Sequence, residues 1–252
     1  MAESRRLEAG ISRTPFARPD VERERRRGMP EIVLASSKTT AQCLAIAASL
    51  LKDTGRAIMS RVPPELEEAL AEAYGREGFE WFPASRTALL RTKEGDVETT
   101  GGRVGILTAG TSDEPVAEEA AIICRELGCI VHIVQDVGVA GIHRLFDPLE
   151  QLLHQQDVDV IIVAAGMDGA LPSVVSGLVD VPVIGLPTSI GYGLGGRGEA
   201  ALLAMLQTCS PGLAVVNIDN GVGAGAMAAL IANRVAAARR QATSPPREDD
   251  GV

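Results

Sequence analysis

A short loop rich in glycine, serine and threonine joins an apolar run to a predicted helix near the middle of the chain. The run Val104–Leu107 is typical of a short buried strand, and Pro115 suits the first turn of a helix. The loop Gly110–Asp113 lies between them. A strand that leads through such a loop into a helix N-terminus gathers unpaired backbone N–H groups, and these bind an anion, most often a phosphate. An ordinary turn with a Ser or Asp cap explains the same residues equally well.

Four later strand ends are also polar or rich in glycine. They lie in the stretches Gln135–Arg144, Ala164–Pro172, Pro187–Gly196 and Asn217–Gly225. In open parallel sheets ligands bind beyond the carboxyl ends of the strands. Glycine at such a place lets the backbone approach a ligand or turn with positive φ. One such loop is routine, but five on one edge favour a nucleotide-sized ligand.

Two side chains have the chemistry of proton transfer or nucleophilic attack. His143 is suited to binding a phosphate, to moving protons, or to capping the helix that it begins. A lone cysteine beside an apolar helix, such as Cys209, is usually a small core residue, and the same interpretation holds for Cys43, Cys124 and Cys129. No pair of the four has a CxxC spacing, which predicts reduced thiols and neither a disulfide framework nor a zinc site.

Two literal dinucleotide-binding fingerprints are weak signals. They are Gly191-x-Gly193-x-x-Gly196 and Gly221-x-Gly223-x-x-Ala226. Neither follows the first strand of the predicted sheet, and neither has the ribose-binding acid at the usual offset. The sequence has no P-loop motif, which excludes P-loop ATP hydrolysis.

Strands and helices alternate from Arg103 to about Arg239. Strands are predicted at Val104–Leu107, Ile130–Val134, Val158–Val163, Val181–Gly185 and Leu213–Val216. Helices are predicted at Glu114–Leu127, Ile142–His154, Ala170–Leu178, Ala200–Thr208 and Gly223–Arg239. Beta-branched runs separated by amphipathic helices predict an α/β domain at 103–239 with a doubly wound, flavodoxin-like parallel sheet.

A smaller α/β domain is predicted at 29–95. Its strands are expected at Glu31–Ala35, Ala57–Met59, Phe79–Phe82 and Ala88–Leu90, and its helices at Thr40–Leu51 and from Pro63-Pro64 to Tyr74. The turn Ser36–Thr39 repeats the anion-site pattern in weaker form, with Lys38 either at a phosphate or solvated. A polar hinge, Thr92–Gly102, separates the two domains.

The ends of the chain are charged and poor in core residues. Residues 1–28 are predicted to form an exposed arm, helical around Val21–Arg27, which packs on another subunit or, in better agreement with its charge, is solvated. Residues 241–252 are predicted to be a disordered tail.

The composition narrows the functional classes. Hydrophobic residues make up 46% and aromatic residues only 3%, so the core consists of Ala, Val, Ile and Leu, as in parallel sheets covered by helices. The net charge of −9 gives a nucleic-acid role no support. No apolar run of membrane-spanning length and no signal peptide is evident, so we expect a cytoplasmic protein that does not act at a membrane.

The loops resemble those of the aminoimidazole ribonucleotide carboxylase (PurE) superfamily. This resemblance rests on Gly110–Pro115, on His143-Arg144 and on the glycine loop before Leu171-Pro172. It is closer to one branch, the LarB-type pyridinium-3,5-biscarboxylic acid mononucleotide synthases of nickel-pincer cofactor assembly. The stretches that resemble this branch are Gly110–Asp113, Asp136–Arg144, Ala165–Val175, Leu202–Cys209 and Asn217–Gly221. That branch shares the N-terminal domain, which purine carboxylases lack.

The resemblance implies carboxylation of the nicotinate ring of nicotinic acid adenine dinucleotide by CO2 or bicarbonate, with phosphoanhydride cleavage that releases AMP. It implies Cys209 as the nucleophile, Asp168 as the base and His143 as a further catalytic residue. The residues it implies at the bound nucleotide are Gly110, Thr111, Ser112, Asp113, Asp136, Arg144, Gly166, Met167, Gly169, Ser189, Tyr192, Asp219 and Asn220.

Some of these assignments keep alternatives. Asp113 is expected at a ribose or phosphate rather than only as a helix cap, while Asp219 and Asn220 suit a ribose hydroxyl, a magnesium ion or an Asx turn. No tightly bound cofactor is implied. Superfamily members are octamers, and the small residues of 223–238 suggest close helix packing between subunits, so we expect a homo-oligomer.

Three positions depart from the pattern of the branch. Asp168 stands where Glu is usual, Gly196 stands where an aromatic residue is usual, and Ala35–Thr39 replaces a Gly-Glu-Gly-Lys-Thr loop. Two other functions remain open. In a purine carboxylase or mutase the histidine of a Ser-Ala-His-Arg setting carries the chemistry, but here Gly141-Ile142 replaces Ser-Ala. A nucleotide-binding regulatory module would bind a ligand without turnover.

Overall fold

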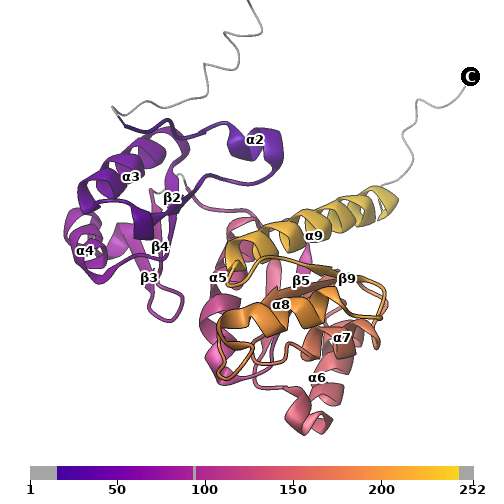
Figure 1. Cartoon of the computed structure of the whole chain (residues 1–252). Coiled ribbons are helices and arrows are strands. Elements are labelled where there is room, and N and C mark those ends of the chain that lie inside the picture. Colours follow the sequence, from indigo (N-terminus) through magenta and orange to yellow (C-terminus); the bar gives the residue numbers. More distant parts are fainter. Residues whose placement is uncertain (1–15, 93–94, 244–252) are drawn as a thin grey trace, which may run out of the picture. The chain divides into compact units, whose positions relative to one another are not determined.

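The chain forms two compact units that divide between Val97 and Glu98 (Figure 1). The computed structural model describes residues 16–92 and 95–243. The predictions for residues 1–15 of the arm and 244–252 of the tail fall outside these residues. The last helix runs to Thr243, so Gln241–Thr243 of the predicted tail are helical.

The core of the N-terminal unit is a four-stranded sheet with two long helices. Its strands are β1 (Ile32–Leu34), β2 (Arg56–Ser60), β3 (Phe79–Phe82) and β4 (Thr87–Arg91), in the order β1-β2-β4-β3. Its helices are α3 (Thr40–Thr54) and α4 (Pro64–Gly78). Strand β1 is parallel to β2, and the other pairs are antiparallel. Val33, Met59 and Leu90 belong to the core cluster that α3 and α4 share with the sheet.

The loop after β1 is occupied by its own contacts. The Thr39 hydroxyl accepts a hydrogen bond from the Gln42 amide, and the Gln42 side chain accepts one from the Thr39 amide, which makes a capping box for α3. Lys38 Nζ donates to the Leu34 carbonyl at 2.9 Å. The Lys38 ammonium and the Thr39 amide are therefore engaged within the unit. This does not favour an anion site at the turn Ser36–Thr39.

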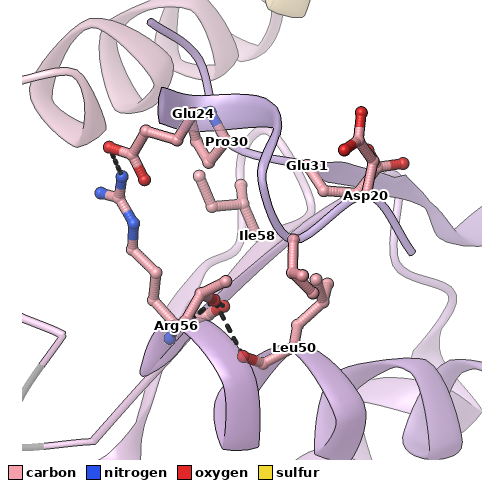
Figure 2. A pocket seen from close by; sticks show the side chains of 9 residues that line it. Asp20, Glu24, Pro30, Glu31, Leu50, Arg56 and Ile58 are labelled. Atoms are coloured by element: carbon pink, nitrogen blue, oxygen red, sulfur yellow. Dashed lines mark hydrogen bonds and ion pairs between the residues drawn. The ribbon is translucent and has the colours of Figure 1, made fainter. Parts of the chain in front are cut away.

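The described part of the arm packs on its own unit. Helix α2 (Arg23–Arg27) lies where a helix was predicted, and Val21 before it packs against the N-terminal core. Glu24 is ion-paired with Arg56, whose side chain is buried under the arm (Figure 2). Arg23 and Glu31 form a second pair at 2.9 Å. From residue 16 on, the arm is thus part of the unit and not simply solvated.

The C-terminal unit contains a sheet of five parallel strands. These are β5 (Arg103–Thr108), β6 (Ile130–Val134), β7 (Val160–Ala165), β8 (Val183–Pro187) and β9 (Leu213–Val215). Their order is β6-β5-β7-β8-β9, and each neighbouring pair is parallel. This is the flavodoxin-like 2-1-3-4-5 order. The predicted doubly wound sheet is confirmed.

Five helices cover the two faces of this sheet. They are α5 (Glu114–Glu126), α6 (His143–His154), α7 (Leu171–Ser176), α8 (Glu199–Leu206) and α9 (Gly221–Thr243). Ile161 and Val163 of β7 share a core with the apolar residues of α6, α7 and α8. Helices α5 and α9 pack on each other and on β5 and β7. Because side chains alternate along a strand, the second pair covers the opposite face.

Glycines of α9 allow close contact with α5. A Cβ on Gly225 would lie 2.5 Å from the Ala120 carbonyl oxygen, and one on Gly221 would lie 2.7 Å from Glu119 Oε2. Gly221 of the second dinucleotide fingerprint therefore serves helix packing within the chain. The small residues of α9 were also predicted to pack between subunits; those on its buried side pack on α5 inside one unit, and packing between subunits stays a prediction.

Helix α9 is also long and apolar enough to cross a membrane by length and composition, contrary to expectation. In the most apolar 18-residue stretch of this helix, 44% is buried inside the protein. The contacts with α5, β5 and β7 are those of a core helix in an α/β domain.

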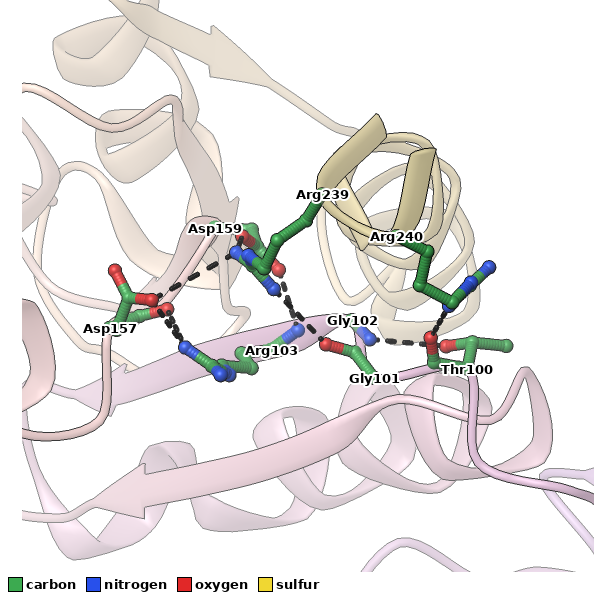
Figure 3. A network of polar contacts seen from close by, with 8 residues as sticks. All are labelled: Thr100, Gly101, Gly102, Arg103, Asp157, Asp159, Arg239 and Arg240. Carbon is green, nitrogen blue, oxygen red and sulfur yellow. Dashed lines mark hydrogen bonds and ion pairs between the residues drawn. The ribbon is translucent and has the colours of Figure 1, made fainter. Parts of the chain in front are cut away.

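A network of charged residues joins the end of α9 to the amino edge of the sheet. The buried Asp159 carboxylate accepts hydrogen bonds from the Arg103 amide at 2.8 Å and from the Arg239 guanidinium at the end of α9 (Figure 3). Arg103 is in turn paired with Asp157, and Arg240 donates to the Thr100 carbonyl. This network fixes the C-terminal half of α9 to the start of β5.

Candidate functional site

The loop after β5 turns its carboxylate into the protein. Asp113 is only 4% exposed. Its Oδ2 accepts a hydrogen bond from the Gly110 amide at 2.9 Å and its Oδ1 accepts one from the Thr188 hydroxyl at 2.6 Å. The Gly166 amide is a third donor to this carboxylate. One side chain thus joins the loops that follow β5, β7 and β8.

Burial raises the pKa of Asp113 above its ordinary value. The three hydrogen bonds oppose this effect, and the nearby charge of Asp219 adds to it. With so little surface, Asp113 is placed to hold the loops together. The structure thus shows a joining role for Asp113, and the ribose or phosphate contact that the resemblance implied stays a prediction.

The loop after β9 is hydrogen-bonded to the end of β8 and to the loop that follows it. Asp219, at φ +54°, accepts a hydrogen bond from the Ser189 amide at 2.7 Å and donates its own amide to the Pro187 carbonyl. Asn220 Oδ1 accepts a hydrogen bond from the Gly223 amide at 2.8 Å, which caps α9. Ser189 and the neighbouring Thr188 therefore connect β8 to two carboxylates. The structure brings the predicted positions 110, 113, 166, 189 and 219 together.

The two longer helices that begin beside these carboxylates differ in the side chains at their first turns. At the start of α9, Glu119 accepts from the Val222 amide and Asn220 from the Gly223 amide. At the start of α5, Thr111 and Ser112 are exposed, and neither hydroxyl is hydrogen-bonded to a described residue. Hydroxyls at the positive end of a helix dipole are donors of the kind that can bind an anion, so the anion site before α5 stays a prediction.

The loop after β6 is hydrogen-bonded to the end of β5 and leads to an arginine in the first turn of α6. Asp136 has φ +58° and donates its amide to the Thr108 hydroxyl at the end of β5. Its carboxylate is ion-paired with Arg144 at 2.5 Å, and both side chains are about half exposed. Such a pair is weak, so Arg144 can exchange Asp136 for an anionic ligand at little cost. His143 begins α6, is exposed, and has no hydrogen-bond partner among the described residues.

The loops after β7 and β8 pack tightly against one another. A Cβ on Gly166 would lie 2.2 Å from the Ile190 carbonyl oxygen, and Met167, at φ +52°, donates its amide to that oxygen. A Cβ on Gly169, at φ +61°, would lie 2.6 Å from Ala201 Cα of α8. Gly166 is therefore required by the contact between the two loops and Gly169 by the contact with α8, while their place at a ligand stays a prediction. Asp168 is left exposed, with its Oδ1 3.4 Å from the Ala170 amide.

Exposed apolar side chains also lie in the loops after β7 and β8. Tyr192 is 82% exposed and Leu194 is fully exposed, in a loop that Gly191 brings beside Met167. An aromatic ring or a flat apolar ligand could lie against them. No group of three or more histidine, cysteine, aspartate or glutamate side chains within residues 16–92 and 95–243 is arranged to hold a metal ion.

Cys209 lies at the other edge of the sheet. Helix α8 begins after β8 at the carboxyl edge and returns to the amino edge, where the turn 207–212 leads into β9. The Val183 amide, at the start of β8, donates to the Gly212 carbonyl at 3.1 Å. The Ser210 hydroxyl holds the turn on α7 through the Ser173 carbonyl at 2.9 Å. Cys209 is exposed, whereas Cys43, Cys124 and Cys129 are buried as predicted.

Sequence reasoning missed two residues of the site. Thr188 was not singled out, although a threonine directly after a buried strand is a recognisable hydrogen-bond donor for a neighbouring loop. Glu119 was not singled out either, and no local pattern ties it to α9. The position of Cys209 could have been inferred, because a helix that follows one parallel strand must return to the amino edge before the next strand.

Two family models match the chain. The model described as AIR carboxylase matches residues 103–246, and the model described as LarB/PurE-like N-terminal domain matches residues 11–93. An uncharacterised protein of Methanocaldococcus jannaschii is 43% identical over 84% of this chain and 82% of its own length.

Similarity to purine enzymes is more limited. N5-carboxyaminoimidazole ribonucleotide mutases of Methanocaldococcus jannaschii and Thermotoga maritima are each 34% identical, over 49% and 51% of this chain and 74% of their own length. Among solved structures, a Treponema denticola PurE2 variant matches 56% of this chain and 94% of its own, with 19% identity and a TM-score of 0.41.

Proposed function

The chain belongs to the AIR carboxylase family, and from this premise we propose that it carboxylates the pyridinium ring of nicotinic acid adenine dinucleotide. The carboxyl group comes from CO2 or bicarbonate. The same enzyme cleaves the phosphoanhydride of the dinucleotide with water, so that the products are AMP and pyridinium-3,5-biscarboxylic acid mononucleotide. We place this activity in the cytoplasm, in a homo-oligomer of eight subunits.

The observation that carries the proposal is the pairing of the two matched domains. The LarB/PurE-like N-terminal model and the AIR carboxylase model together account for most of the chain. The purine mutases match only about half of it, 49% to 52%. An enzyme with this second domain is expected to act on another substrate than the purine precursor.

The proposed chemistry begins at the thiol. A pyridinium ring is electron-poor and cannot attack CO2. Within one chain Cys209 lies at the opposite edge of the sheet from Asp168, so the thiol at the ring belongs to a neighbouring subunit of the proposed oligomer. Its thiolate adds at C4 and gives a dihydropyridine, whose C5 is then a carbon nucleophile. After C5 has attacked CO2, a base removes the C5 proton and the electron pair expels the thiolate, which restores the aromatic ring. Cysteine suits both steps because it is a strong nucleophile and a good leaving group.

Asp168 is the proposed base, because it is an exposed carboxylate on the loop after β7. The open amides and hydroxyls before α5 are proposed to hold a phosphate, with Thr111, Ser112 and Arg144 as the polar contacts. Met167 and Tyr192 are proposed to contact a ring. The resemblance also favours Gly110, Gly166, Gly169, Ser189, Asp219 and Asn220 at the ligand, and we assign to these the shape of the pocket. No resident cofactor is proposed, and a role for Mg²⁺ is left to the assay.

A direct test uses labelled bicarbonate. The purified protein is incubated with nicotinic acid adenine dinucleotide and ¹³C-bicarbonate, with and without Mg²⁺, and the products are weighed by mass spectrometry. We expect one labelled carboxyl group in the mononucleotide and an equal amount of AMP. The Cys209→Ala variant should form neither product, whereas His143→Ala should keep partial activity.

The purine alternative makes the opposite prediction. A purine carboxylase or mutase would convert aminoimidazole ribonucleotide substrates, would depend on His143 and would tolerate Cys209→Ala. A regulatory module would bind the dinucleotide without a labelled product. Turnover of the purine substrate, with none of the dinucleotide, would overturn the proposal.

A further inference from the structure

The loops at the carboxyl edge of the five-stranded sheet contain few positive charges for an anionic ligand. In the stretches 108–113, 135–144, 165–172, 187–198 and 216–225 the arginines are Arg144 and Arg197, and there is no lysine. The proposed substrate has a pyrophosphate and a ring carboxylate, and both are anionic. Since Arg144 is proposed to contact a phosphate, Arg197 is the arginine of these loops that has no assigned partner.

Arg197 is held in a backbone conformation that suits glycine better. Its φ is +68°, in the left-handed region where a Cβ is unfavourable, and the residues on both sides of it are glycines. Asp136 and Asp219 also have positive φ in neighbouring loops, but aspartate tolerates this region and both side chains have partners there. Such strain in a residue without a local partner points to a use of its side chain.

The guanidinium of Arg197 is not engaged by the protein. The side chain is exposed, and it forms no hydrogen bond or ion pair with any residue of 16–92 or 95–243. Arg144, in contrast, is paired with Asp136. A guanidinium presents its N–H donors in a planar fork that matches the two oxygens of a carboxylate. Because exposed arginines are common on protein surfaces, the position of the backbone decides whether Arg197 can serve the site.

The backbone beside Arg197 is packed into the carboxyl edge. A Cβ on Gly198 would lie 2.8 Å from the Thr188 carbonyl oxygen and 2.7 Å from Ile218 Cγ2. Thr188 is the residue whose hydroxyl donates to Asp113. Arg197 is therefore fixed beside the end of β8 and the loop after β9, next to the residues that join the loops of the site.

The proposed base lies on a loop that contacts the same segment. A Cβ on Gly169 would lie 2.6 Å from Ala201 Cα, and Asp168 directly precedes Gly169. Arg197 comes four residues before Ala201. On a nicotinate ring the C3 carboxylate and the C5 proton lie on the two sides of C4. An arginine at the first and an aspartate at the second would flank one ring.

We propose that Arg197 binds the C3 carboxylate of the nicotinate ring and selects the acid form of the dinucleotide over the amide form. The inference rests on the proposed function, which puts this ring at the carboxyl edge. A carboxylate accepts two N–H donors of a guanidinium and attracts its charge. A carboxamide is uncharged, and its NH2 group is a donor that cannot pair with the N–H groups of arginine.

Binding of the two dinucleotides tests the inference. Cys209→Ala protein, which cannot form the thiol adduct, is titrated in a calorimeter with nicotinic acid adenine dinucleotide and with nicotinamide adenine dinucleotide. We expect the acid form to bind about 10- to 100-fold more tightly, the size of a hydrogen bond to a charged group. Adding Arg197→Gln should weaken the acid form by this factor and leave the amide form within about twofold. Arg197→Lys keeps the charge without the fork and should keep part of the preference.

Two further variants separate recognition from folding. Arg125→Gln removes another exposed arginine of the same unit, in the last turn of α5, and should change neither affinity. Arg197→Gly should leave the Tm nearly unchanged, because glycine suits the positive φ, yet lose the preference for the acid form. A Tm that falls with both Arg197→Gln and Arg197→Gly would show that the side chain serves the fold, and overturns the inference.

The remaining outcomes distinguish this inference from the proposed function. An equal loss of affinity for both dinucleotides places Arg197 at a phosphate, and unchanged affinities leave it solvated; either result overturns the inference. If the protein selects the acid form through Arg197 but wild type makes no labelled product, the proposed function fails and the inference stands. If wild type binds neither dinucleotide, both fail.

Discussion

Replacing Thr188 by valine tests whether the buried carboxylate holds the site together. The Thr188 hydroxyl is fully buried and lies 2.6 Å from Asp113 Oδ1. Valine keeps the shape of the side chain and removes only this donor. A hydrogen bond to a charged group contributes about 1.5–3 kcal/mol, and no water can replace it here. We expect the C-terminal unit to lose about 2 kcal/mol of unfolding free energy, or roughly 4–8 °C in Tm.

The loss of unfolding free energy caused by Thr188→Val should increase as the pH rises. The hydrogen bond from Thr188 lowers the pKa of Asp113, which burial raises, so the variant's pKa rises further. Where Asp113 is protonated in both proteins, the lost bond is a neutral one and costs about 1 kcal/mol. As the pH rises through the raised pKa, the wild type ionises first and the difference in stability grows, then levels off.

The measurement must report on the C-terminal unit. The single tryptophan, Trp81, lies in the N-terminal unit, so tryptophan fluorescence does not follow the loops around Asp113. Hydrogen exchange of β5 and β8 by mass spectrometry, or calorimetry, is suitable. Thr188→Ser is the control, because it keeps the hydroxyl and loses only a methyl group, worth about 1 kcal/mol. Equal stability of the two variants at neutral pH, or a loss that is the same at every pH, would refute the reasoning.

Three further predictions concern single residues. Under native conditions a maleimide should label one thiol of the four, and Cys209→Ala should abolish the labelling; modification of a second thiol in the folded protein would contradict the burial of the others. Gly225→Ala should destabilise α9 by about 1–3 kcal/mol, because its Cβ would lie 2.5 Å from the Ala120 carbonyl oxygen, and urea unfolding with Met227→Ala as the exposed control on the same helix measures this. Asp159→Asn should cost about 1–3 kcal/mol and increase exchange at the end of α9, since it removes the charge that Arg239 contacts; unchanged exchange there would show that the ion pair does not hold the helix.

The amino-acid sequence by itself determined the secondary structure and the class of the fold. Every predicted strand is present within about two residues of its expected ends, because beta-branched runs and glycine-rich loops act locally. The same alternation of strands and helices placed five polar loops on one edge of a parallel sheet. The family followed from the residues of those loops.

Only the tertiary structure decided what each loop residue contacts. Asp113 points inward because Thr188 and Gly166, from strands that are distant in the sequence, supply its donors. The glycines of α9 serve α5, since two helices that are about a hundred residues apart approach closely there. Cys209 is separated from the site because its helix returns to the amino edge. Such contacts depend on strand order and helix direction, which residue type and spacing along the chain do not specify.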